Sequence, residues 1–271
     1  MNRSPVWLLC AGLLATMSAG STVSAQAPAP APAPAPQAAA PAAPALPSTE
    51  EVLKRFRVAM GGEAAIRKRT ARSMKGTFEI PAQGMKGDLS IVAAAPDKYL
   101  LIVTLPGLGE LQRGFDGTLG WSVDPAIGPR LLEGNELAEF RHSADFYLDL
   151  HEPAKFKSMT VVGRTTFEGQ ECIELKLVKD SGFEYTEFFS VATGLIVGTK
   201  LNVSSQMGSV PVTSIVSDYK SFDGTLVPVV TRQRMMGLEQ LTTILSVSFD
   251  PIDAKVFELP PAIAALAAQK K

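Results

Sequence analysis

The sequence has few of the residues that most often carry catalysis or bind metals. Its 271 residues include only two cysteines and two histidines. Cys10 lies in an apolar N-terminal segment that we expect to be removed, so Cys172 would be the one cysteine of the mature protein. A lone cysteine cannot form an internal disulfide or a structural thiolate zinc site. We therefore expect the hydrophobic core to hold the fold together.

Motifs for catalysis and phosphate binding are also missing. The segment nearest to the G-x-S-x-G of serine hydrolases is Gly120-Trp121-Ser122-Val123-Asp124, which lacks the second glycine and falls on a predicted strand. There is no Walker loop, and no G-x-G-x-x-G lies between a strand and a helix. The sequence therefore predicts neither an enzyme nor a cofactor.

The chain has no excess of charge of one sign. Its net charge is −1 at pH 7, and loss of the N-terminal segment with Arg3 changes this to −2. Without a basic field, a protein has no electrostatic means of recruiting nucleic acid. Nucleic acid is therefore not an expected partner.

One of the two histidines, His142, lies in a predicted helix from Glu133 to Leu150, and His151 directly follows it. His142, Asp145 and Asp149 have the spacing i, i+3 and i+7, which places them on one helix face. A hydrolytic zinc site needs three protein ligands, and a dedicated pattern such as H-E-x-x-H is absent. Between a metal site and a solvated helix face, we predict the helix face and no metal.

Residues 1–25 have the three regions of a secretory signal. Arg3 supplies the positive charge, residues 6–17 form the apolar region, and Val23-Ser24-Ala25 is a small-x-small cleavage site. The apolar run is shorter than the roughly 20 residues that a spanning helix needs. We predict an exported protein with a cleaved leader; the alternative is an uncleaved leader that tethers the chain to the inner membrane.

A spacer and a helical segment follow the leader. Residues 26–47 are almost entirely alanine and proline, which favours an extended spacer or a disordered tail left by cleavage. The folded domain is predicted over residues 48–261, with a C-terminal tail at 262–271. Ser48 and Glu51 fit a capping box that starts a helix. That helix has an apolar stripe of Val52, Leu53, Phe56 and Met60, and it ends at Gly61-Gly62.

Beyond Arg72 the apolar residues alternate with period two, which indicates strands. Roughly ten or eleven strands joined mainly by short turns are typical of an antiparallel sheet. This spacing favours an up-and-down barrel or a large, strongly curved sheet with two or three helices, an α+β fold. Asp116-Gly117 predicts a two-residue hairpin turn before the strand that carries Trp121.

The apolar surplus of this sheet is the main clue to function. Two or three helices cover a large sheet incompletely, and an uncovered concave face can hold an apolar ligand. The alternative is a filled core. By residue type and strand parity, we predict that the cavity is lined by Trp121, Phe78, Leu101 and Leu201. Cys172 should point away from the Ile173 side of its strand, as a small residue on a sheet face.

Several segments together resemble one known family. They are the helix ending in Gly61-Gly62, Gly76-Thr77-Phe78-Glu79, the stretch from Gly114 to Trp121, Gly128 to Gly134, Asp218 to Pro228, and Asp253 to Phe257. This ensemble resembles the LolA-like outer-membrane lipoprotein-sorting superfamily over nearly all of residues 48–261. The resemblance implies an unclosed antiparallel half-barrel wrapped around helices, with an apolar cavity that takes acyl chains in the periplasm.

Two functions follow as hypotheses. The first is a non-catalytic periplasmic domain that binds a lipid or lipoprotein acyl chain in the half-barrel, in lipid or lipoprotein transport. The alternative is an envelope sensor or scaffold that binds a protein partner, as implied by RseB-like relatives of this fold. Its contact would be the sheet edge or the helical region from Glu133 to Leu150. A hydrolase comes third, because it would need a three-ligand cluster around His142.

Overall fold

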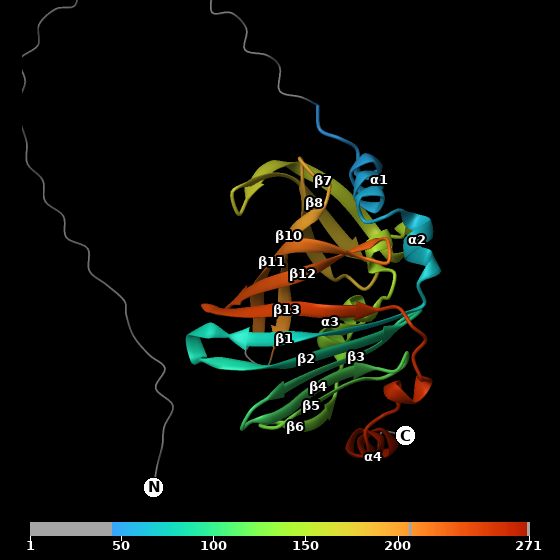
Figure 1. The fold of residues 1–271 in the computed structure, drawn as a ribbon, viewed down its shortest axis with the longest axis vertical. Helices are drawn as coiled ribbons and strands as arrows, with labels where there is room; N and C mark the ends of the chain where they lie inside the picture. The colour runs from blue at the N-terminus through green and yellow to red at the C-terminus, as the bar shows by residue number, and fades with distance from the viewer. Residues whose placement is uncertain (1–44, 206–207, 270–271) are drawn as a thin grey trace, which may run out of the picture. The chain divides into compact units, whose positions relative to one another are not determined.

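The computed structural model describes residues 45–205 and 208–269 (Figure 1). The predicted leader, most of the predicted spacer, residues 206–207 and residues 270–271 lie outside the described residues. Among the described residues, no helix is both long and apolar enough to cross a membrane.

The predicted N-terminal helix is present, and a second short helix follows it. Helix α1 spans Thr49–Ala59, and Ser48 and Glu51 form the capping box in both directions. Gly61 and Gly62 adopt φ values of 112° and 93°, which glycine permits without steric cost. They separate α1 from α2 (Glu63–Lys68). The apolar stripe of α1 is buried against the sheet in a core cluster with Leu175, Leu177 and Phe189.

All thirteen described strands belong to one antiparallel sheet. Their bounds are β1 (Ala71–Ile80), β2 (Met85–Ala94), β3 (Lys98–Leu105), β4 (Gly109–Phe115), β5 (Gly120–Asp124), β6 (Gly128–Leu131), β7 (Phe156–Phe167), β8 (Gln170–Lys179), β9 (Glu184–Ser190), β10 (Ile196–Ser205), β11 (Gly208–Phe222), β12 (Thr225–Met235) and β13 (Leu238–Ser248). The order is β6-β5-β4-β3-β2-β1-β13-β12-β11-β10-β9-β8-β7, so the sheet has two ends and is not closed. The predicted α+β fold with an open antiparallel half-barrel is confirmed.

The structure has more strands than the ten or eleven predicted. One reason is β6, a short strand that contains Pro129, a residue that strands normally disfavour. Proline is tolerated there because β6 is an end strand and does not need every backbone N–H for pairing.

Helix α3 (Gly134–Ala144) shows how strongly the sheet curves. It contacts β4 and β5 and also β10, although seven steps in the strand order separate β4 from β10. In a flat sheet that separation would be roughly 34 Å, at about 4.8 Å per step, whereas a helix is only about 10–12 Å across. The sheet therefore wraps around α3 (Figure 1). We call the side that faces α3 the inner face and the opposite side the outer face.

Helix α4 (Pro261–Gln269) covers the outer face near β6. Its Ile263 is fully buried in a cluster with Leu100, Trp121 and Phe257. Residues 262–271 were expected to be a tail. Two of them, Ile263 and Leu266, instead pack in this cluster. The short helices η1 (Pro81–Gln83), η2 (Leu148–Leu150), η3 (Pro153–Lys155) and η4 (Ala254–Phe257) complete the described chain.

The predicted hairpin is present, but its turn is longer than two residues. Phe115 pairs with Gly120, so four residues connect β4 to β5. The Asp116 carboxylate accepts hydrogen bonds from the backbone N–H groups of Thr118 and Leu119, each at 2.7 Å. Aspartate thus acts here through its side chain, as in an Asx-turn, while Gly117 supplies the positive φ of 102°.

Replacing Gly114 by alanine is expected to destabilise this hairpin. A Cβ atom at Gly114 would collide with the indole ring of Trp121, which is buried beneath α4. Overpacking of this kind costs about 1–3 kcal/mol. Chemical denaturation measures the effect, and Gly163→Ala in β7 is the matched control because nothing lies within 4 Å of the added atom. Equal stability of the two variants would contradict the packing.

Candidate functional site

An apolar surface runs across the middle of the inner face. Its buried centre consists of Leu89, Val103, Val229 and Ile244. Around it lie five large apolar side chains that are only half-buried: Met74, Phe78, Ile91, Leu101 and Leu105. We call these nine residues the inner strip.

Strand register explains why the inner strip is continuous. Met74 on β1 is opposite Ile91 on β2, which is opposite Leu101 on β3. Alternate residues of a strand share a face, so the neighbouring apolar residues extend this row in both directions. Leu101 in turn is opposite Arg113 on β4, which bonds to Glu136 of α3 at 3.1 Å. This contact places the strip on the inner side.

The four residues predicted to line a cavity are only partly brought together. Phe78 and Leu101 belong to the inner strip. Leu201 lies on β10 and packs in the cluster beneath α1. Trp121 is opposite Gly114 and shares the outer face with Leu100, beneath α4. Their role in binding a ligand stays a prediction.

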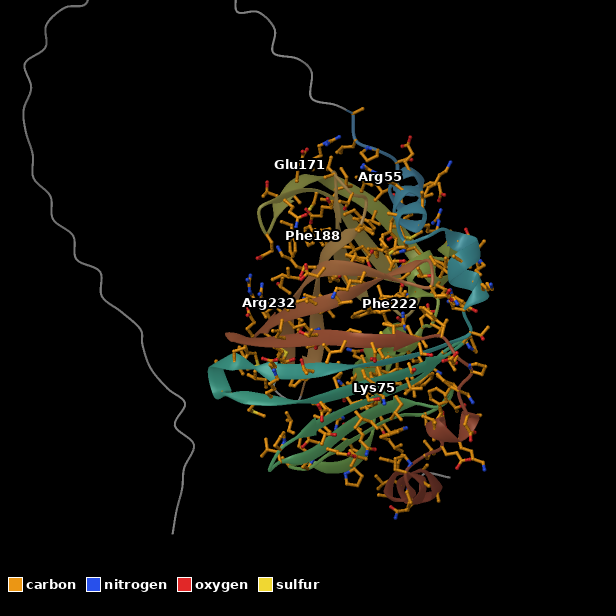
Figure 2. The ribbon with its side chains drawn as sticks, in the orientation of Figure 1. Arg55, Lys75, Glu171, Phe188, Phe222 and Arg232 are labelled. Atoms are coloured by element: carbon orange, nitrogen blue, oxygen red, sulfur yellow. The ribbon has the colours of Figure 1, made fainter. Side chains whose placement is uncertain are left out.

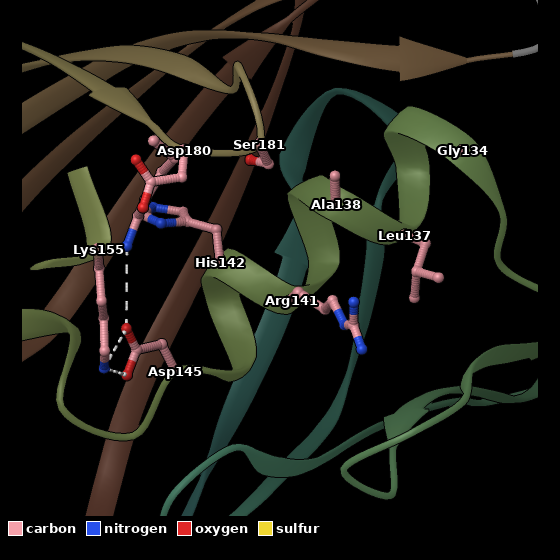
Figure 3. Close-up of a pocket in the computed structure, with 10 residues that line it drawn as sticks. Gly134, Leu137, Ala138, Arg141, His142, Asp145, Lys155, Asp180 and Ser181 are labelled. Carbon is pink, nitrogen blue, oxygen red and sulfur yellow. Dashed lines mark hydrogen bonds and ion pairs between the residues drawn. The ribbon is translucent and has the colours of Figure 1, made fainter. Parts of the chain in front are cut away.

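A cavity of about 320 Å³ lies between α3 and the turn that follows β8 (Figure 3). Its volume falls at the lower end of the range for small-molecule pockets, about 300–1,000 Å³. The lining residues are Gly134, Leu137, Ala138, Arg141, His142, Asp145, Lys155, Lys179, Asp180 and Ser181. The cavity therefore combines a small apolar wall with several charged groups.

Asp145 organises the charged side of this cavity. Its two carboxylate oxygens accept hydrogen bonds from Lys155 Nζ at 2.8 and 3.0 Å, and Lys179 Nζ lies 3.8 Å away (Figure 3). The Lys179 ammonium also lies 4.2 Å from the centre of the Phe156 ring. Burial lowers the pKa of Lys179, and the nearby Asp145 carboxylate opposes that shift. The arrangement holds two ammonium groups around one carboxylate.

His142 is half-buried next to this charged group. Its ring lies 4.5 Å from the ring of Tyr185, between centroids. Burial lowers the pKa of His142 to about 3, and the positive charge of Lys179 adds to the shift. Its Nδ1 atom and the Tyr185 hydroxyl have no hydrogen-bond partner among the described residues. His142 is therefore neutral near pH 7.

The predicted solvated helix face is wrong, and so is the single face that a metal site would have used. Helix α3 ends at Ala144 rather than Leu150, because Asp145 leaves the helical conformation at φ −60° and ψ 107°. His142 is half-buried, and Asp149 lies in η2. Within residues 45–205 and 208–269, no group of three or more His, Cys, Asp or Glu side chains could hold a metal ion.

His151 forms a buried pair that the sequence analysis missed. Its Nε2 lies 2.7 Å from a carboxylate oxygen of Glu187, and both residues are buried. Burial alone would lower the pKa of His151, but the Glu187 carboxylate and its hydrogen bond outweigh that effect and raise it. The pair ties η2 to β9 across the core, so it serves the fold.

Cys172 is a fully buried residue on the outer side of β8. It packs against Phe167, Phe188 and Val197, whereas Ile173 belongs to the cluster beneath α1. The predicted opposite orientation of Cys172 and Ile173 is confirmed. Burial raises the pKa of the thiol, which disfavours the reactive thiolate.

Comparisons with known proteins bear on the fold. No protein-family model and no curated protein sequence matches the chain. A LolA superfamily protein from Nitrosomonas europaea is similar in structure, with a TM-score of 0.53 and 10% identity over 79% of this chain and 99% of that protein. A DUF1329 family protein from Desulfovibrio piger has a TM-score of 0.54 and 12% identity over 77% and 96%. At these identities the likeness concerns the fold alone, and this chain has a LolA-like fold.

Proposed function

We propose that this protein is an exported, non-catalytic domain that binds a lipid or lipoprotein acyl chain on the inner strip. The observation that carries the proposal is the incomplete burial of Met74, Phe78, Ile91, Leu101 and Leu105 on the inner side of an open sheet. A filled core would bury large apolar side chains of this kind. A contiguous apolar surface left partly exposed is typical of a binding site.

Burial of the chain supplies the binding energy. Each CH₂ group removed from water contributes about 0.8 kcal/mol, so affinity should rise with chain length. An open sheet leaves a route by which the ligand can leave, as a carrier requires. Export to the periplasm rests on the predicted leader of residues 1–25, and the Ala/Pro segment of residues 26–47 would space the domain from its surroundings.

Bound lipid is the most direct test. Purified protein is extracted with organic solvent for mass spectrometry, then delipidated and titrated with a fluorescent fatty acid. Leu101→Arg places a charge on the inner strip and is expected to weaken binding at least tenfold, because about 1.4 kcal/mol of lost affinity gives that factor. Thr104→Arg is the matched control, since Thr104 is exposed on the other face of β3.

Thermal unfolding checks that both variants fold. If the Leu101→Arg variant does not fold, the milder Leu101→Ala replaces it. Absence of extracted lipid together with absence of fluorescent fatty acid binding would refute the proposal. Equal losses of fatty acid affinity in the Leu101→Arg and Thr104→Arg variants would also refute it.

The structure favours the lipid over a protein partner at the sheet edge. Strand β7 ends the sheet, and an end strand exposes pairing groups that another chain could use. However, β7 has register shifts between Phe156 and Ser158 and between Val161 and Gly163. Such bulges blunt an edge against further pairing. A partner cross-linked in cell envelopes, retained by the Leu101→Arg variant and lost on altering α3, would favour the alternative.

A further inference from the structure

A second cavity contains hydrogen-bond donors that have no partner. It measures about 40 Å³ and lies where α2, the start of β1 and the start of β12 meet. The Nε atoms of Arg69 and Arg72 and the hydroxyl of Thr225 line this region, are buried, and have no hydrogen-bond partner within the described parts of the chain. Thr225 as a whole is only 7% exposed. Buried donors without partners are costly, so a ligand that accepts hydrogen bonds would stabilise this site.

Two arginine side chains line this cavity. The guanidinium of Arg69 is neutralised by Asp223. One of its terminal nitrogens lies 2.5 Å from the Asp223 carboxylate, and the other donates to the Asp223 backbone carbonyl at 2.6 Å. Arg72 differs, because it forms no ion pair with any carboxylate of the described residues; its guanidinium lies 5.7 Å from the centre of the Phe146 ring. Arg72 is half-buried with its Nε atom fully buried, and a guanidinium partly withdrawn from water is stabilised by a counter-ion.

Asp149 is the one acidic residue in the lining. It is not within ion-pair distance of Arg72 in the described structure. Burial raises the pKa of Asp149, although the positive charge of Arg72 opposes the shift. The charged form of Asp149 is therefore disfavoured, which limits how far it could replace an external anion.

Size and shape indicate the kind of anion. A cavity of about 40 Å³ holds a group on the order of a few water molecules. A carboxylate is a planar group of that order, and its two oxygens match the fork of a guanidinium. The remaining walls are apolar and consist of Met60, Ile66, Phe146, Leu226, Val227, Pro228 and Phe249. Such walls suit a carboxylate attached to an apolar chain.

The cavity adjoins the inner strip along two strands, β1 and β12. Arg72 lines the cavity, and Met74, two residues along β1, belongs to the strip. Val227 lines the cavity, and Val229, two residues along β12, belongs to the strip. Residues two apart share a face and lie roughly 6.6 Å apart along the strand. The donors are therefore at one end of the apolar surface.

We propose that the cavity at Arg69, Arg72 and Thr225 binds the carboxylate of a long-chain fatty acid whose acyl chain lies on the inner strip. This inference rests on the proposed function and narrows its ligand to an amphiphile with a free carboxylate. Arg72 supplies the unpaired positive charge, and Thr225 and Arg69 supply further donors.

The test compares palmitate with hexadecanol, which has the same chain length and no charge. Both are titrated by displacement of a fluorescent fatty acid at pH 8. Wild-type protein is expected to bind palmitate at least roughly tenfold more tightly, because charge-assisted hydrogen bonds are the strong ones. Arg72→Gln should reduce this ratio to about one while leaving the hexadecanol affinity within about twofold.

Two further variants separate charge from structure. Arg72→Lys keeps the positive charge and should retain part of the preference for palmitate. Lys75→Gln removes a positive charge from an exposed position on the same strand and should leave the ratio unchanged.

The outcomes distinguish this inference from the proposed function. If neither compound binds, both fail. If the two bind equally well to wild-type protein, only the carboxylate site is refuted. The site is also refuted if Arg72→Gln keeps the preference, or if it weakens both ligands by the same factor.

Discussion

Replacing His151 by phenylalanine is expected to lower the free energy of unfolding by about 3–5 kcal/mol, because it leaves a buried carboxylate without its partner. His151 is 1% exposed, and its Nε2 atom lies 2.7 Å from Glu187, which is 6% exposed. Phenylalanine keeps the ring that packs edge-on against Phe56. The loss measured by chemical denaturation would therefore report the unpaired charge rather than a cavity.

The double variant His151→Phe/Glu187→Leu is the control for this prediction. It removes both charges, and apolar replacement of a complete buried pair is often neutral or stabilising. We expect it to be clearly more stable than His151→Phe alone. A double variant that loses the sum of the two single effects would show that the residues do not act as a pair.

Acid should destabilise the protein through His142, by on the order of 3 kcal/mol between pH 6.5 and pH 4. Burial depresses the pKa of this side chain to about 3 in the folded state, whereas an unfolded histidine titrates near 6.5. Below pH 6.5 the unfolded chain therefore binds a proton that the folded chain does not. Each such pH unit costs about 1.4 kcal/mol of stability.

Unfolding of wild-type protein and His142→Gln at pH 7 and pH 4 measures this effect. The variant lacks the titrating group, so its loss of stability should be smaller by about 3 kcal/mol, while the contribution of the carboxylates cancels in the comparison. Identical losses of stability in the two proteins would contradict the depressed pKa of His142 in the folded state.

The pH dependence of stability that His151 contributes has the opposite sign to that of His142. Its pKa is raised in the folded state, so its contribution is fully present below the unfolded pKa of about 6.5 and is lost as pH rises through the folded pKa. The chain has only these two histidines, so single variants separate the two effects.

Local features of the fold could be predicted from the sequence because their causes are local. The capping box of Ser48 and Glu51 and the helix stop at Gly61-Gly62 depend on residues a few positions apart. Strand alternation likewise follows from a side-chain period of two. Errors occurred where neighbours in space decide the outcome: α4 forms over the outer face, and α3 ends at Ala144.

The candidate site was only half predictable for a related reason. Alternation shows which residues share a face, and Phe78 and Leu101 lie in one cluster. It does not show which face turns inward. Trp121 was grouped with Phe78 and Leu101 by residue type and strand parity, whereas it lies beneath α4 on the outer side. Arg72 is a charged residue that alternation places on the same strand face as the apolar Met74. This placement was the feature of the sequence that could have indicated the second cavity.

The sequence by itself determined an antiparallel sheet with a capped N-terminal helix, a chain without catalytic motifs, and an excess of apolar residues. Only the tertiary structure decided where that excess stays exposed and which polar groups meet. Arg72 and Thr225 line one cavity although they are far apart in the chain, and His151 reaches Glu187 across the core. Such encounters depend on packing between elements that are distant in the sequence rather than on any local pattern.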